Sequence, residues 1–110
     1  MKIAVAFWGI TRSLNYTINS IHDKIFSVFK EHNIDYQIFM HTYNVHTIYN
    51  NKRANEFNVM LDNNQYSLLK PDLLLLDDQD EIKKKLNLTS YRTKKDPWNS
   101  NYQTMDNFIL

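Results

Sequence analysis

The chain has 110 residues, the length of one small domain, and its 43% content of hydrophobic residues excludes an intrinsically disordered protein. The formal net charge is +1, so no strong overall field favours an acidic membrane, and we expect no nucleic-acid partner. The absence of cysteine excludes a disulfide scaffold, a cysteine-based zinc site and a catalytic thiol.

The first predicted element is a strand over residues 3–8. Its side chains are apolar on both sides, which is typical of a strand in a parallel sheet that is covered on both faces. The stretch also has some likeness to a signal peptide, but its apolar part is short, Arg12 stands soon after it and no small-residue cleavage site is present. No segment approaches the roughly 20 apolar residues of a membrane-spanning helix, so we expect no membrane span.

A helix is predicted next, with Ser13 as a plausible N-cap and an end near His32. One apolar stripe at i, i+3, i+7, i+10 and i+11 defines this helix: Ile18, Ile21, Ile25, Val28 and Phe29. A second strand is predicted over residues 35–41. The polar residues 42–52 after this strand indicate a loop.

The rest of the chain continues the alternation of helix and strand. We predict short helical segments over 53–61 and 65–70, a third strand over 73–76, a helix over 82–88, a loop over 89–103 and the start of a helix over 104–110. This order favours an α/β fold, a three-layer sandwich with a small, mostly parallel sheet and right-handed crossovers. We expect residues 1–110 to be a single domain.

Polar or small residues come after the end of each predicted strand. Ligands in open α/β sheets bind outside the carboxyl ends of the strands, so we expect these segments to meet at one edge. After the first strand, Gly9 permits close backbone approach and Arg12 could hold a phosphate with its planar fork. The alternative is a tight turn with a solvent-facing arginine, because a lone G-x-x-R is neither a dinucleotide fingerprint nor a P-loop.

The second strand ends in His41, Thr42 and Tyr43, with His46 close behind. Two histidines at this spacing match no recognised metal pattern. A histidine that closes a strand is more often held by a structural hydrogen bond than used as a ligand. Tyr43 and Trp8 could flank a flat ligand such as a base or a sugar ring, although such aromatic side chains more often simply pack.

The third strand is followed by a D-x-D pattern at Asp78 and Asp80. Paired carboxylates at a strand end could hold Mg²⁺ or Mn²⁺ bridged to a diphosphate. In the alternative, Asp77 or Asp78 caps the next helix while Asp80 and Glu81 complement its positive end. We favour the cap and keep the metal site as the second interpretation.

Three stretches resemble the opening of the WavE-like lipopolysaccharide-synthesis proteins and of related glycosyltransferases in bacteria and large DNA viruses. They are K-I-A-V-A-F-W-G-I-T-R-S, I-F-M-H-T-Y and L-L-K-P-D-L-L-L-L-D-D-Q-D-E-I, and they cover most of residues 2–82. The resemblance implies a Rossmann-like, GT-A-type fold of the nucleotide-diphospho-sugar transferases. It implies that Gly9 and Arg12 lie at the donor-binding edge beside His41, Thr42 and Tyr43, and we add Trp8 to this predicted nucleotide-sugar site.

The implied activity is transfer of a sugar from a nucleotide-sugar to a hydroxyl group of a glycan or protein acceptor, with Mn²⁺ or Mg²⁺ as cofactor. In such proteins the metal-binding aspartates follow a further helix and strand, so residues 1–110 resemble the N-terminal, donor-binding half. The alternative is a non-catalytic interaction or structural protein on a truncated domain, whose exposed sheet edge would need a partner, such as a homo-oligomer. We expect a cytoplasmic location, in the host cytoplasm if the protein is viral.

Overall fold

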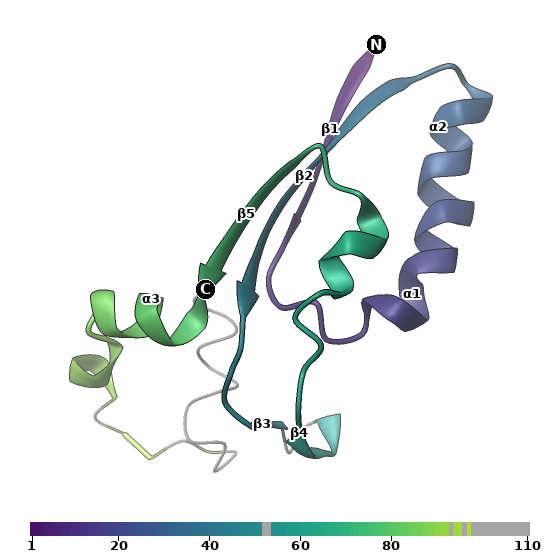
Figure 1. Ribbon diagram of the computed structural model, residues 1–110. Coiled ribbons are helices and arrows are strands. Elements are labelled where there is room, and N and C mark those ends of the chain that lie inside the picture. The colour runs from purple at the N-terminus through teal and green to yellow at the C-terminus, as the bar shows by residue number, and fades with distance from the viewer. Residues whose placement is uncertain (52–53, 93, 96, 98–110) are drawn as a thin grey trace.

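Three parallel strands form the central sheet (Figure 1). They are β1 (Lys2–Trp8), β2 (Asp35–Asn44) and β5 (Leu73–Asp78), in the order β1-β2-β5. The structure is a computed structural model, and it describes residues 1–51, 54–92, 94, 95 and 97. The predicted α/β fold with a small parallel sheet is therefore confirmed. Both β2 and β5 run further than predicted, because Thr42, Tyr43 and Asn44 pair with Leu76, Asp77 and Asp78.

One continuous helical stretch connects β1 to β2. It consists of α1 (Leu14–Ile21), a π-helical segment η1 (His22–Phe26) and α2 (Ser27–Glu31). The predicted apolar stripe is confirmed for Ile18, Ile21, Ile25 and Phe29, which pack against the buried core, but not for Val28, which is 40% exposed. Ser13 does stand at the N-cap position, but its side chain makes no capping hydrogen bond.

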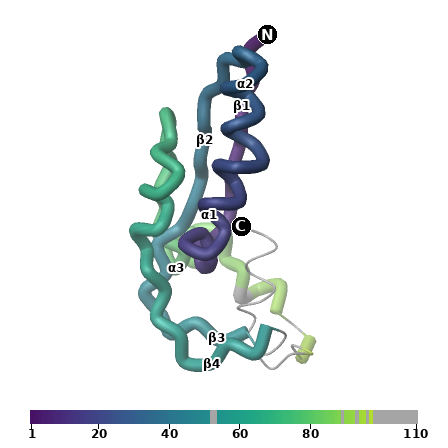
Figure 2. The backbone as a smooth tube through the Cα atoms, turned by 90° about the vertical axis from the view of Figure 1, so that its right-hand side faces the viewer, coloured from purple at the N-terminus to yellow at the C-terminus, as the bar shows by residue number. Residues whose placement is uncertain are grey.

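The hydrophobic core lies between these helices and one face of the sheet. Its buried members are Leu14, Phe26, Ile38, Met40 and Leu69. Leu69 comes from the 3₁₀ helix η3 (Gln65–Leu69), which lies beside α1 on the same face of the sheet (Figure 2). A helical segment was predicted at this position, and it is confirmed.

Helices cover only one face of the sheet in the described part of the chain. Figures 1 and 2 agree that the helical stretch and η3 lie together on that side. On the other face, the exposed residues are Ala4, Ala6 and Trp8 of β1 and Leu73 and Leu75 of β5; Leu74, on the helix-covered side of β5, is exposed as well. The prediction of cover on both faces is thus not met by the described residues, which supply two of the three expected layers.

Two short strands, β3 (Tyr49–Asn51) and β4 (Glu56–Val59), pair antiparallel outside the main sheet. The loop predicted over 42–52 is confirmed only at residues 45–48, and the helix predicted over 53–61 is wrong at β4. Tyr49 is fully buried, and Asn55 and Asn58 take positive φ angles that helices do not use. Asparagine tolerates this conformation, so its abundance here suits turns better than a helix.

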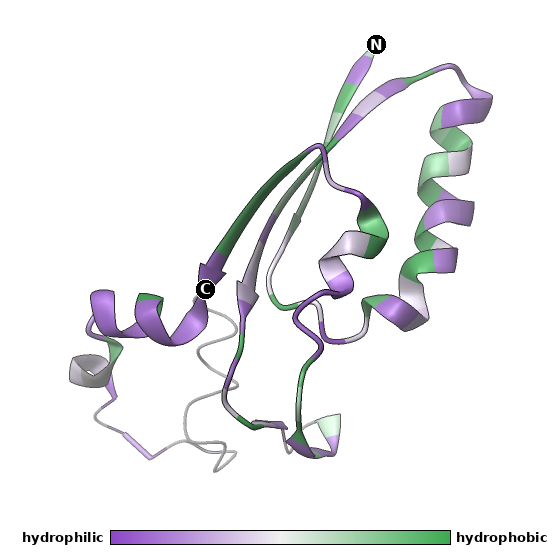
Figure 3. Cartoon of the chain, in the orientation of Figure 1, coloured by the Kyte–Doolittle hydropathy of each residue, from purple (hydrophilic) through white to green (hydrophobic). Residues whose placement is uncertain are grey.

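After β5 the chain forms α3 (Gln79–Lys85) and the 3₁₀ helix η4 (Leu88–Tyr91). Figure 3 shows β5 as an apolar strand and α3 as a hydrophilic helix. The helix begins earlier than predicted, and η4 replaces the beginning of the predicted loop. The predicted start of a helix over 104–110 lies outside the described residues. No helix that the structure describes is both long and apolar enough to cross a membrane.

Candidate functional site

The turn after β1 depends on the backbone freedom of Gly9. Its φ angle is +102°, a conformation that residues with a side chain rarely adopt. No described atom lies within 4 Å of the place where a Cβ would stand, so the backbone angle and not crowding favours glycine here. The Gly9 amide donates to the His41 carbonyl oxygen at 3.1 Å, which ties the turn to β2.

A pocket of about 160 Å³ lies where β1 passes through this turn into α1. Residues 7–14 line it together with Thr17, Met40 and Leu69. Whole-ligand sites usually measure roughly 300–1,000 Å³, so this pocket has room for a group of phosphate size. Of the predicted donor-site residues, Trp8, Gly9 and Arg12 line the pocket.

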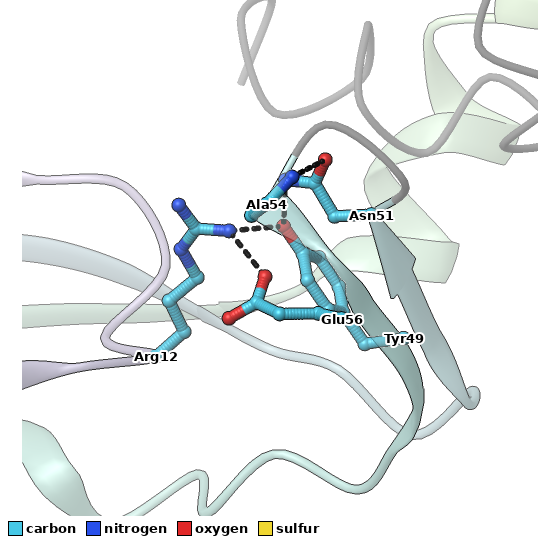
Figure 4. Close-up of polar contacts among 5 residues, drawn as sticks. All are labelled: Arg12, Tyr49, Asn51, Ala54 and Glu56. Atoms are coloured by element: carbon cyan, nitrogen blue, oxygen red, sulfur yellow. Dashed lines mark hydrogen bonds and ion pairs between the residues drawn. The ribbon is translucent and has the colours of Figure 1, made fainter.

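The Arg12 side chain links the turn to the β3–β4 pair (Figure 4). Its Nη1 donates to Glu56 Oε2 at 2.7 Å and to the Tyr49 hydroxyl at 2.9 Å. Asn51 Nδ2 donates to the same hydroxyl at 3.2 Å, and the Ala54 amide donates to Asn51 Oδ1 at 3.3 Å. Within the described residues, Arg12 Nε and Nη2 have no hydrogen-bond partner, so one edge of the guanidinium remains open to an anion.

The contacts of Arg12 could not be found in the sequence. Glu56 is 44 residues away and Tyr49 is 37 residues away. No motif or periodicity in the sequence relates residues that are so far apart. Tyr49 and Glu56 come together through the pairing of β3 with β4, which only the structure shows. Sequence reasoning therefore missed both partners.

His41 lies on the uncovered face of the sheet and has a carboxylate partner. Its Nε2 is 2.9 Å from Asp77 Oδ2, and its ring contacts that of Tyr43 with centroids 4.7 Å apart. The sheet register sets Trp8 beside His41 and Tyr43 beside Asp77. The structural hydrogen bond expected for His41 is present.

Burial raises the pKa of the Tyr43 hydroxyl, and the nearby Asp77 carboxylate raises this pKa further. The folded chain therefore holds this proton more tightly than the unfolded chain, whose tyrosine ionises near pH 10. The resulting stability is fully present below about pH 10 and is lost as pH rises through the folded-state pKa. We expect the free energy of unfolding, measured by urea titration from pH 8 to 11, to fall less steeply in Tyr43→Phe. An equal fall in both proteins would contradict this assignment.

Thr42 points to the other face from its neighbours, because side chains alternate along a strand. It is almost fully buried, and its hydroxyl has no hydrogen-bond partner within the described part of the chain. It shares the helix-covered face with Met40, which lines the pocket, but Thr42 itself is not a lining residue. Of the six predicted donor-site residues, Gly9 and Arg12 thus lie in the turn after β1, Thr42 on the helix-covered face, and Trp8, His41 and Tyr43 on the other face.

Asp78 caps helix α3, as we favoured. Its Oδ1 accepts from the amides of Asp80 at 2.9 Å and Glu81 at 3.0 Å, and its Oδ2 lies 3.1 Å from His46 Nε2. Asp77 and Asp78 point to opposite faces of the strand, so Asp77 contacts His41 and Asp78 contacts His46.

These contacts do not suit a metal site. Both carboxylate oxygens of Asp78 are engaged, and the described residues hold no group of three or more side chains that could bind a metal ion. We therefore derive no chemistry through a divalent cation. The assignment of Asp78 and Asp80 to Mn²⁺ or Mg²⁺ stays a prediction.

Removal of the cap gives a direct test of its role. We expect Asp78→Ala to lower the free energy of unfolding by about 1 kcal/mol, the usual cost of a lost N-cap side chain. Asp78→Asn should cost less, since asparagine also caps helices and loses only the charge that faces His46. Equal losses in the two variants, measured by urea denaturation, would show that the ion pair and not the cap stabilises this region.

A larger hollow of about 590 Å³ opens between the π-helical segment and the start of β2. Its lining includes His22, Asp23, Lys30 and Asp35, so charges of both signs face it. It lies at the amino end of the strands, whereas ligands of open α/β sheets bind at the carboxyl ends. The turn at Gly9 is for this reason the better candidate site.

Comparison of the chain with protein-family models, with curated proteins and with solved structures found no match.

Proposed function

We propose that the chain is the donor-binding portion of a glycosyltransferase and that the turn of residues 9–13 binds the diphosphate of a nucleotide-sugar. The observation that most supports this is the turn itself. A glycine with positive φ ends a parallel strand, borders a phosphate-sized pocket and leads into a long helix. Strand–turn–helix junctions of this kind favour anions, because amide groups and the helix dipole converge there.

Arg12 would supply the positive charge of this site. One edge of its guanidinium carries two donors without a partner in the described residues, which matches the geometry of a phosphate oxygen pair. Glu56 accepts from Nη1 on the other edge of the guanidinium. The Arg12 side chain is 37% exposed and the Glu56 side chain is 33% exposed. The ion pair therefore fixes the position of the guanidinium and leaves it accessible from solvent.

The rest of the donor would extend beyond the pocket, which is too small for a whole nucleotide-sugar. The exposed Trp8 ring offers a surface on which a flat base or the apolar face of a sugar can stack. His41 is its neighbour across the sheet and could donate a hydrogen bond to a sugar hydroxyl.

Calorimetric titration with UDP-glucose and GDP-mannose, each with and without Mn²⁺, tests the proposal. We expect submillimolar binding of at least one of them, with inorganic pyrophosphate as a weaker competitor. Absence of binding at millimolar concentrations would overturn the donor site. Transfer of a labelled sugar to an acceptor would separate a transferase from an enzyme that only hydrolyses the donor.

One observation favours a second candidate, a non-catalytic interaction or structural protein. Arg12, His41 and Asp78 each have a partner inside the fold, as a structural role requires. Under this alternative the pairs only stabilise the domain and no nucleotide-sugar binds. Light scattering would then show a homo-oligomer or a stable complex with another protein.

A further inference from the structure

His41 and Asp77 form a pair at the carboxyl edge of the sheet in which one imidazole nitrogen stays open. His41 Nε2 lies 2.9 Å from Asp77 Oδ2, and a carboxylate only accepts, so Nε2 carries the proton. Nδ1 of the neutral ring then holds the lone pair, and it donates only when the ring is charged. Among the described residues Nδ1 has no hydrogen-bond partner, and the His41 side chain is 37% exposed. Nδ1 can therefore accept a proton from a molecule outside the fold.

This arrangement is that of a general base with an orienting carboxylate. Asp77 holds the ring from the neighbouring strand β5 and stabilises the positive charge that the ring acquires when it takes up a proton. The Tyr43 ring contacts the His41 ring with centroids 4.7 Å apart, so a second group limits the rotation of the imidazole. The ring is thus held in one orientation while Nδ1 keeps its lone pair for a substrate.

The pair lies next to the proposed donor site. The register sets His41 beside Trp8, and the Gly9 amide donates to the His41 carbonyl oxygen at 3.1 Å. Trp8 lines the pocket at the turn and is also 78% exposed. The pocket extends to the helix-covered side of the sheet, where Met40 and Leu69 line it, whereas the His41 side chain lies on the other face. A sugar stacked on Trp8 would therefore have the diphosphate on one side and the imidazole on the other.

We propose that His41 is the catalytic base of the glycosyl transfer, that Asp77 positions it, and that the transfer inverts the anomeric carbon. His41 Nδ1 takes the proton of the acceptor hydroxyl while the hydroxyl oxygen forms a bond to the anomeric carbon. The bond between that carbon and the diphosphate oxygen breaks, and its electron pair leaves with the diphosphate on the side of Arg12. The imidazolium then releases its proton to water. Attack from the side opposite the leaving group is a single displacement, which inverts the configuration.

This inference rests on the proposed donor site, and one experiment separates the two. Water can replace the acceptor hydroxyl, so the release of UDP from UDP-glucose, or of GDP from GDP-mannose, measures the step in the chain as it is. We expect the protein to bind one of these donors and to release its nucleotide. Binding without release would overturn the catalytic role of His41 and leave the donor site standing. Absence of binding would overturn the donor site itself.

Replacement of His41 tests the base directly. His41→Gln should lower the kcat of nucleotide release by about 100-fold or more, the usual contribution of a general base, while donor affinity stays close to that of the parent protein. His46→Gln is the matched control, because His46 Nε2 also lies near a carboxylate, 3.1 Å from Asp78 Oδ2, but on the other face of β5. It should release nucleotide at the parent rate. An unchanged kcat in His41→Gln, or equal losses in both histidine variants, would overturn the assignment.

Asp77→Asn tests the positioning role, and it also serves if His41→Gln does not fold. Asparagine keeps the shape of the side chain and removes the charge. We expect kcat to fall and KM to stay the same, because the imidazolium needs its counter-charge only during the reaction. A purely structural role of Asp77 would change KM and the free energy of unfolding instead. A kcat equal to that of the parent protein would overturn the positioning role.

The configuration of the released sugar gives an independent readout. Both donors carry an α-linked sugar, so a single displacement by water releases the β-anomer first. Proton NMR during the first minutes of the reaction, before the anomers interconvert, identifies the product. Early release of the β-anomer would support a base on the side opposite the diphosphate, and early release of the α-anomer would overturn the proposed step.

Discussion

Replacement of Arg12 by alanine should lower the affinity for the nucleotide-sugar by about 10- to 100-fold. This loss corresponds to about 1.5–3 kcal/mol, the usual contribution of a hydrogen-bonded interaction with a charged group, which we assign to the open edge of the guanidinium as a whole because the side chain is partly exposed. Arg12→Lys keeps the charge but loses the planar fork, so its affinity for the nucleotide-sugar should lie between that of the parent protein and that of Arg12→Ala. Calorimetric titration at constant ionic strength measures all three proteins.

Glu56→Gln is the matched control for this experiment. Arg12→Ala removes a contact to the β3–β4 pair as well as the cation, and a partly exposed ion pair contributes up to about 1 kcal/mol to stability. Glu56→Gln weakens the same ion pair and keeps the arginine. Nucleotide-sugar affinity should stay the same or rise in Glu56→Gln, because the charge of Arg12 is no longer neutralised. An equal loss of affinity in both variants would mean that Arg12 acts only by holding the β3–β4 pair.

The elements that the sequence predicts well are those with a strong local signal. The stripe from Ile18 to Phe29 has the helical period over three turns, so the helix and its buried face were predictable. The carboxylate of Asp78 caps the helix that begins next to it, which is also a local relation. Both predictions needed only residues that are near one another in the chain.

The predictions that failed depend on relations that local propensity does not carry. Helix was predicted where β4 lies, because the antiparallel pairing of β4 with the nearby β3 is a tertiary contact and not a matter of local propensity. The residues of the predicted donor site were chosen because each lies at or just after the end of a predicted strand. Side-chain alternation places Thr42 on one face of β2 and His41 and Tyr43 on the other, which was missed because the strand was predicted to end at residue 41 and in fact runs to Asn44.

Phe26→Ala should have the largest effect on stability. Phe26 is only 5% exposed, and its ring stacks on that of Tyr36 with centroids 5.1 Å apart and planes 2° apart. It also meets the His22 ring edge-on at 5.3 Å, so it joins the π-helical segment to β2. Truncation of a buried phenylalanine costs about 3–5 kcal/mol, a large share of the stability of a small domain.

Urea denaturation followed by circular dichroism measures this loss, with Val28→Ala as the control on the same helical stretch. Val28 is partly exposed, so its truncation should cost less than about 1 kcal/mol. If Phe26→Ala does not fold, Phe26→Leu should show a smaller loss in the same direction. Equal costs for Phe26→Ala and Val28→Ala would contradict the core assignment. Because Phe26 does not line the pocket at Gly9, Phe26→Leu should bind the nucleotide-sugar as the parent does, which separates damage to the core from damage to the site.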